Sequence, residues 1–158
     1  MDADALTALL AGRLAAIVPA GFHVQARDGM LWYSADQGRF PGQQGDYRTG
    51  QAGTYVRDNL GAFGDTDADA VTGVAARALD ELQDYVSEAT HDPWPGTRAQ
   101  PRPYARIQDA LLHLGYGDPD APVLACAPIP LPPSSASATD DCHLLTARAV
   151  RLPQPSVG

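Results

Sequence analysis

Two alternating segments on either side of Asp28-Gly29 constrain the fold of this chain more than any other feature. A two-residue turn of this type needs positive φ at both positions, which Asp and Gly tolerate, and it joins two antiparallel strands. The segments 22–27 and 30–35 are therefore predicted to form a hairpin in which Gln25 faces Trp32. A hairpin with one apolar face must be covered, so the chain needs at least one further layer.

The two faces of this hairpin differ in chemistry. One face is apolar and is predicted to point into the core; it carries Phe22, Val24, Ala26, Leu31, Tyr33 and Ala35. On the opposite face, an aromatic and a methionine stand among polar residues, and we expect something to cover them. That cover is the chain's own loop 36–53, the short helix after it, or a partner protein or ligand. The interface candidates are Trp32, Met30, His23, Gln25 and Arg27.

Helical spacing of apolar residues predicts two main helices, over 4–18 and 67–90. The second ends at Thr90, because Pro93 three residues later forbids its continuation. A shorter helix is predicted at 54–63.

The remaining ordered segment is predicted to be a second hairpin, at 104–129. Residues 104–116 fit a helix or a strand, and the strand is favoured; after a turn at 117–122, Val123 to Ile129 returns. The expected fold class is α+β, with an antiparallel sheet of four to five strands (two hairpins) packed on two main helices. Residues 1–130 are expected to form a single domain, and the Pro/Ser/Ala-rich residues 131–158 a poorly ordered tail.

The charge of the chain narrows the classes of partner. It has 19 acidic and 11 basic residues, for a net charge of −8, and every basic residue is arginine, a bias typical of GC-rich bacterial genomes such as those of actinobacteria. Negative charge disfavours nucleic acids and anionic membranes. We expect a protein partner with a basic surface, or a homo-oligomer. The acidic start of the chain does not resemble a signal peptide, which favours a cytoplasmic location.

Two segments begin like ligand-binding loops but lack the residues that bind. In 65–69, three Asp residues alternate as in a calcium loop, yet Ala76 stands where the bidentate Glu is needed. In 45–52, the glycine spacing is that of a phosphate loop, but Gln51 and Ala52 replace the required Lys and hydroxyl residue. The four His and two Cys show no metal-binding spacing. We therefore expect no metal and no cofactor.

A ligand pocket is the alternative site. His91 beside Asp92 offers a general base, arginines offer charge for an anion, and a tryptophan between two prolines offers a rigid wall. Each also has a structural interpretation: a histidine after a helix caps its last carbonyls, and a buried tryptophan plugs the edge of a core. The pocket candidates are Tyr47, Arg48, Arg57, His91, Asp92 and Trp94.

The order helix, hairpin, helix, hairpin is similar to that of small α+β accessory proteins, including secretion-chaperone-like and immunity-protein-like domains, by element order alone. No serine or cysteine lies in a nucleophile motif, so no catalytic residue is predicted. We expect a small acidic binding or accessory protein that acts through the hairpin face and an acidic helix. The alternative is a small enzyme or anion-binding protein, which requires the six pocket candidates to converge.

Overall fold

The computed structural model describes residues 2–42, 52–60, 67–96 and 98–132, and of residues 52–55, 58, 59 and 67 the backbone alone. Two long helices and two sets of strands alternate along the chain. The elements are α1 (Ala3–Ala15), β1 (Phe22–Arg27), β2 (Met30–Ala35), β3 (Ala52–Tyr55), α2 (Val56–Asn59), α3 (Asp67–Thr90), β4 (Pro103–Gln108), β5 (Leu111–Asp118), β6 (Ala121–Ala125) and β7 (Ile129–Pro130).

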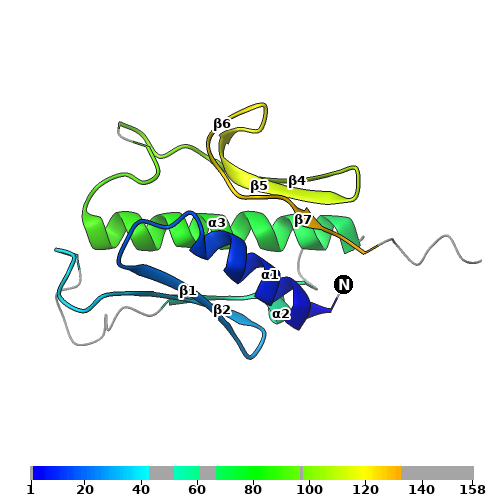
Figure 1. Cartoon of the computed structure of the whole chain (residues 1–158), viewed down its shortest axis with the longest axis horizontal. Helices are drawn as coiled ribbons and strands as arrows, with labels where there is room; N and C mark the ends of the chain where they lie inside the picture. Colours follow the sequence, from blue (N-terminus) through cyan, green and yellow to red (C-terminus); the bar gives the residue numbers. More distant parts are fainter. Residues whose placement is uncertain (1, 43–51, 61–66, 97, 133–158) are drawn as a thin grey trace, which may run out of the picture.

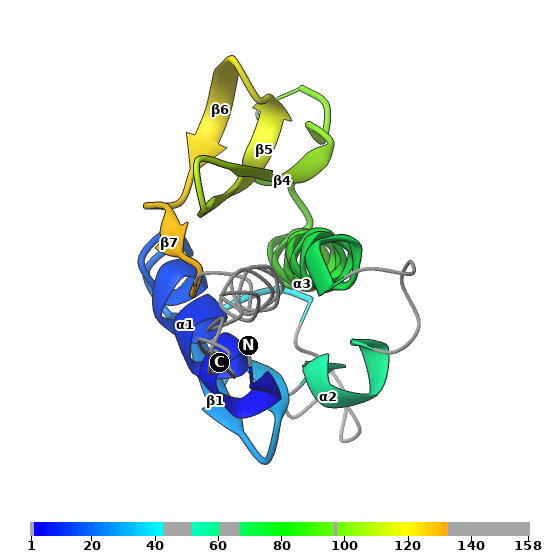
Figure 2. The same cartoon turned by 90° about the vertical axis from the view of Figure 1, so that its right-hand side faces the viewer.

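The strands form two antiparallel sheets, and the long helix α3 lies between them. Sheet A has the order β1-β2-β3; sheet B has the order β4-β5-β6, and β7 also pairs with β5. Sheet B lies on one side of α3, and sheet A, α1 and α2 lie on the other (Figures 1 and 2). The predicted α+β class with antiparallel strands and two main helices is confirmed. The division of the two hairpins between two sheets was not predicted.

Two tyrosines, one from each sheet, hold α3 between the layers. The Tyr33 hydroxyl on β2 donates a hydrogen bond to the carbonyl oxygen of Ala78, at 3.0 Å. The Tyr116 hydroxyl on β5 donates to the carbonyl oxygen of Leu79, at 2.7 Å. Both side chains are fully buried. Adjacent carbonyls of one helix therefore accept from the two sheets, which makes α3 the element that both halves of the molecule share.

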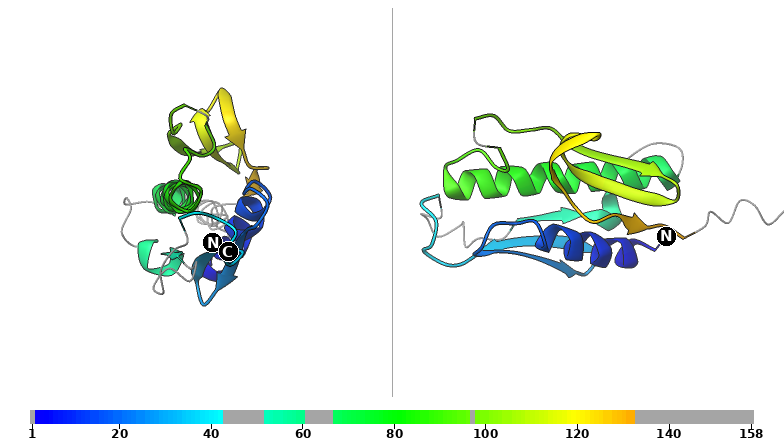
Figure 3. Two further views of the ribbon diagram at one scale, coloured as in Figure 1. Left: turned by 90° about the vertical axis from the view of Figure 1, so that its left-hand side faces the viewer. Right: turned by 45° about the horizontal axis from the view of Figure 1, so that its top comes forward.

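One hydrophobic cluster joins both sheets to the helices. The predicted stripe of α1 is buried, as is the predicted apolar face of α3, where Val74, Leu79 and Leu82 are at most 1% exposed. Burying one such leucine side chain is worth about 1.5–3 kcal/mol. The amphipathic pattern of each helix is thus satisfied, since α1 covers sheet A and α3 contacts both sheets (Figure 3).

The first hairpin has the predicted register. Gln25 pairs with Trp32 and His23 with Ser34. The turn residues Asp28 and Gly29 have φ of 54° and 72°, as this turn requires.

The short helix predicted at 54–63 is wrong at its start. Residues Ala52–Tyr55 form β3, which pairs with β2, and Val56–Asn59 is helical, while residues 61–63 lie outside the described residues. The reason lies in β2, whose Met30-Leu31-Trp32-Tyr33 run is apolar on both faces. Such a run is typical of a strand in the interior of a sheet, which has a hydrogen-bonded neighbour at each edge. Thr54 and Tyr55 have high strand propensity and supply that neighbour.

The choice of strand over helix for 104–116 is confirmed, but the segment holds two strands, β4 and β5, in place of one, and the turn predicted at 117–122 joins β5 to β6. The β4–β5 hairpin itself was not predicted. Its turn lies at Asp109-Ala110, where both residues have positive φ. The predicted single strand from Val123 to Ile129 is wrong. β6 ends at Ala125 and β7 is a separate pair of residues, because Pro128 between them has no N–H to give to a strand ladder.

The C-terminal boundary stays a prediction. Leu131 is half-buried and its N–H donates to the carbonyl oxygen of Ala110, at 2.9 Å. The expected tail, apart from residues 131 and 132, lies outside the described residues. Within the described part of the chain, no helix combines the length and the apolar character that a membrane span requires.

Candidate interaction surface

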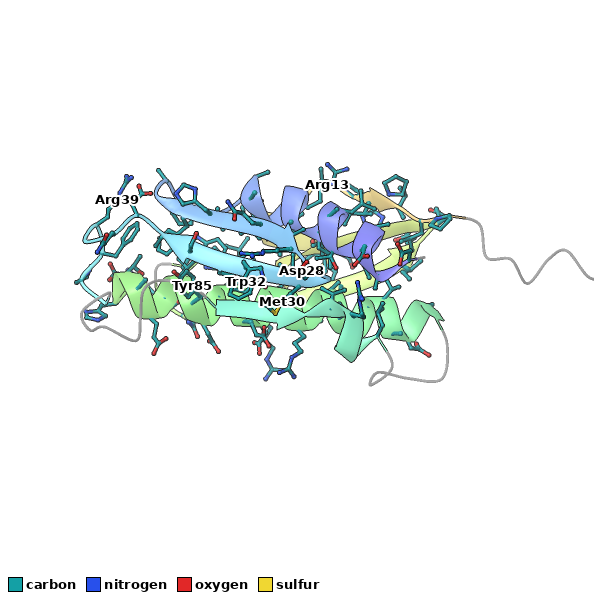
Figure 4. All side chains as sticks on the ribbon, turned by 90° about the horizontal axis from the view of Figure 1, so that it is seen from below. Arg13, Asp28, Met30, Trp32, Arg39 and Tyr85 are labelled. Atoms are coloured by element: carbon teal, nitrogen blue, oxygen red, sulfur yellow. The ribbon has the colours of Figure 1, made fainter. Side chains whose placement is uncertain are left out.

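The five interface candidates share one face of the hairpin, but they differ in exposure. His23, Gln25 and Arg27 form an exposed polar row along β1. Trp32 is half-buried, and Met30 is only 8% exposed. Figure 4 shows Met30 and Trp32 next to each other on sheet A. Met30 therefore lacks the exposure that an apolar interface anchor needs, which for this residue favours cover by the chain itself over cover by a partner.

Trp32 is better explained as part of the packed structure than as a free anchor. Its indole nitrogen is shielded from solvent and has no hydrogen-bond partner in the described structure. An unsatisfied buried donor costs about 1–3 kcal/mol. Exposing the indole nitrogen to a partner would also expose the apolar indole ring. The missing hydrogen bond of Trp32 therefore does not by itself indicate a partner.

A charged cluster that sequence analysis missed lies at the open end of the hairpin, far from the Asp28 turn (Figure 4). The Asp36 carboxylate accepts from His23 Nε2 at 2.8 Å and from Arg39 Nη1 at 3.0 Å. These hydrogen bonds, first from His23 and then from Arg39, lower the pKa of Asp36 below its usual value. The strand alternation carried the signal, because Asp36 is two residues beyond Ser34, the residue opposite His23.

The pocket candidates do not converge. Arg57 lies on α2, beside the N-terminal half of α3, and its Nη2 is 2.6 Å from Asp4 Oδ1. His91 directly follows the other end of α3, a helix of 24 residues, or about 36 Å (Figure 3). Tyr47 and Arg48 lie outside the described residues. Of the four described candidates, Arg57 therefore lies far from the other three, which belong to the His91–Trp94 segment.

The His91–Trp94 segment has the structural role that sequence analysis offered as one interpretation. His91 has a φ of 59°, typical of the residue that ends a helix, and it is exposed together with Asp92. Trp94 packs edge-on against Tyr116 with ring centroids 5.2 Å apart. Its backbone N–H donates to Ser87 Oγ at 3.1 Å. The segment thus packs the chain against the end of α3 and sheet B.

The buried titratable groups are unsuited to nucleophilic or base chemistry at neutral pH. Burial raises the pKa of the Cys126 thiol to about 12, and that of Tyr85 to about 12. Both groups are therefore protonated and neutral. Within the described ranges, no three His, Cys, Asp or Glu side chains lie close enough together to hold a metal ion.

The exposed side of α3 is strongly acidic. The helix holds six acidic residues and one arginine, a net charge of −5 against −8 for the whole chain. The arginine, Arg77, pairs with Glu81 at 2.9 Å. Asp80, Asp84 and Glu88 are exposed and lie four residues apart, so they form one row about 12 Å long. We call this row the carboxylate stripe.

Within the stripe, Asp80 and Asp84 have no basic partner among the residues that the structure describes. Their spacing places two like charges on neighbouring turns, which destabilises a helix by about 0.2–0.5 kcal/mol per pair. Helix α3 was expected to be acidic; the new information is that Asp80, Asp84 and Glu88 share one exposed side, and that Asp80 and Asp84 form no ion pair among the described residues.

Comparison with known proteins gives no match to this chain, whether with protein-family models, curated proteins or solved structures. Its function is therefore argued from the chemistry and geometry of its own surfaces.

Proposed function

We propose that this protein is a small binding or accessory protein that associates with a basic surface of a partner protein through the carboxylate stripe of α3. The observation that carries the proposal is the row formed by Asp80, Asp84 and Glu88, in which the first two form no ion pair among the described residues, Arg77 being paired with Glu81. An exposed row of one charge attracts an oppositely charged surface and steers its approach.

The energetics of the helix support this use of the stripe. Placing lysine or arginine four residues from Asp80 would have stabilised α3, as the Arg77–Glu81 pair does. Instead, like charges face each other. Sequences that break a local stability rule tend to do so where function requires it.

The same charge selects among classes of partner. Two copies of a chain with a net charge of −8 repel each other, so a second copy is a poorer partner than a basic protein. Nucleic acid is disfavoured because phosphates need a basic surface. We also propose a cytoplasmic location, which the free thiol of Cys126 supports, since cysteines stay reduced in that compartment.

A charge-matched pair of variants tests the proposal. The stripe variant carries Asp80→Asn and Asp84→Asn. The control variant carries Asp28→Asn and Asp109→Asn, which removes the same charge from the two hairpin turns, where Asn also tolerates positive φ. Because the net charge is equal, any difference in binding between the variants reports the position of the charge. The stripe variant should unfold no more easily than the wild type, since like-charge repulsion is removed.

Binding is measured first to an oligoarginine peptide, at low and physiological salt. We expect the stripe variant to lose at least about tenfold in affinity, a difference of about 1.4 kcal/mol, and the control to lose much less. The affinity of the wild type should fall as salt rises, because exposed charges are screened over about 8 Å at physiological ionic strength. Equal losses in both variants would show that net charge alone attracts the peptide, and would overturn the stripe as the binding surface.

A second measurement addresses the partner itself. The wild type and both variants are immobilised, and proteins retained from a lysate of the native host are identified and then tested as purified components. The proposal requires a basic partner that binds the wild type and the control but not the stripe variant. A purified partner that binds all three equally contradicts it.

A further inference from the structure

We draw no further inference here: the strongest candidate, the apolar edge strand β6 of sheet B around Val123, which is 59% exposed, carries no proposal because nothing in the structure shows what covers it.

Discussion

The β1–β2 hairpin of sheet A and the β4–β5 hairpin of sheet B close with the same kind of turn, but only the first turn contains glycine. Asp28 and Gly29 have φ of 54° and 72°; Asp109 and Ala110 have φ of 52° and 58°. An alanine in the left-handed region costs about 1–2 kcal/mol. The second turn therefore depends on the strands around it, whereas the first is favoured by its own residues.

The two sheets also differ in how closely the central strand approaches its neighbours. In sheet B, β5 carries Gly115, where an added Cβ would lie 2.4 Å from the carbonyl oxygen of Leu124 and 2.9 Å from the Tyr104 hydroxyl. In sheet A, the equivalent central strand β2 has four large side chains in succession, from Met30 to Tyr33. Sheet B therefore gains close strand approach from glycine, while sheet A fills the space with side chains.

Both halves nevertheless depend on α3, and the largest expected effect tests that dependence. Leu79→Ala and Leu82→Ala should each lower the free energy of unfolding by about 2–5 kcal/mol, because both side chains are fully buried in the shared cluster. Urea denaturation measures the loss. Val123→Ala is the control, since an exposed side chain should change stability by no more than about 0.5 kcal/mol. Neutral leucine variants would show that α3 is not packed between the sheets.

The two tryptophans allow the same experiment to follow each half separately. Trp32 lies on sheet A, and Trp94 packs against Tyr116 of sheet B. Trp32→Phe leaves Trp94 as the only fluorescent tryptophan, and Trp94→Phe leaves Trp32. In each variant, the unfolding transition followed by tryptophan fluorescence should coincide with the transition followed by circular dichroism, as expected for one cooperative unit. Two separate midpoints would mean that the sheets unfold independently despite sharing α3.

A smaller effect is expected at the two turns, with opposite signs. Gly29→Ala should destabilise by about 1–2 kcal/mol, because its φ of 72° disfavours a side chain. Ala110→Gly should stabilise by about 0.5–1 kcal/mol, since the relief of strain exceeds the added chain entropy. Thermal and urea unfolding of both variants measure the difference. If Ala110→Gly lowers stability, the positive φ at this turn is not strained and the comparison of the turns fails.

This contrast also explains which parts of the fold were predictable. The Asp28-Gly29 turn and the alternation around it predicted the register of β1 and β2, because local turn chemistry and burial agreed. At Asp109-Ala110 the local preference opposes a turn, so the sequence indicated one continuous strand over 104–116, and the β4–β5 turn was missed. The placement of the two sheets around α3 involves contacts between residues far apart in the chain, such as the hydrogen bonds that connect Tyr33 and Tyr116 to residues 45 and 37 positions away. No local pattern carries that information.

The candidate surfaces were predictable to a similar degree. The acidic character of α3 follows from its sequence, but the sequence does not show that Arg77 pairs with Glu81 and leaves Asp80 and Asp84 without an ion pair among the described residues. Met30 was expected on the outer face of the hairpin, with the identity of its cover left open, and its burial shows that alternation assigns a side chain to a face without saying what covers that face. His91 and Arg57 were grouped because their chemistry suits an anion site. Their residue types give no information on distance, and the structure places them at opposite ends of α3.

The tyrosine hydrogen bonds should contribute equally from the two sheets. Tyr33→Phe and Tyr116→Phe should each cost about 0.5–1.5 kcal/mol, because each removes one buried hydrogen bond while the Ala78 and Leu79 carbonyls stay within the helix. Urea denaturation of both variants and of the double variant measures the costs. A loss several times larger for one tyrosine would show that α3 belongs mainly to that sheet.

The smallest effect concerns a feature that sheet A has at its open end, the Asp36 cluster. Its lowered pKa means that the folded state holds this carboxylate ionised at pH values where the unfolded chain binds a proton. The resulting stabilisation is present above the unfolded pKa, near 3.8, and is lost as the pH falls through the lower folded value. Asp36→Asn should therefore weaken the dependence of stability on pH in acid and leave the melting of the core intact.

Carboxyl titration by NMR tests the cause of that shift. In His23→Gln and in Arg39→Gln, the pKa of Asp36 should rise toward its usual value, and more in the first variant, because the His23 hydrogen bond is the larger cause. Arg27→Gln is the matched control, since Arg27 lies on the same strand as His23 but contacts Asp28 at 3.5 Å instead. An Asp36 pKa that is unchanged in both test variants would remove the cluster as a difference between the sheets.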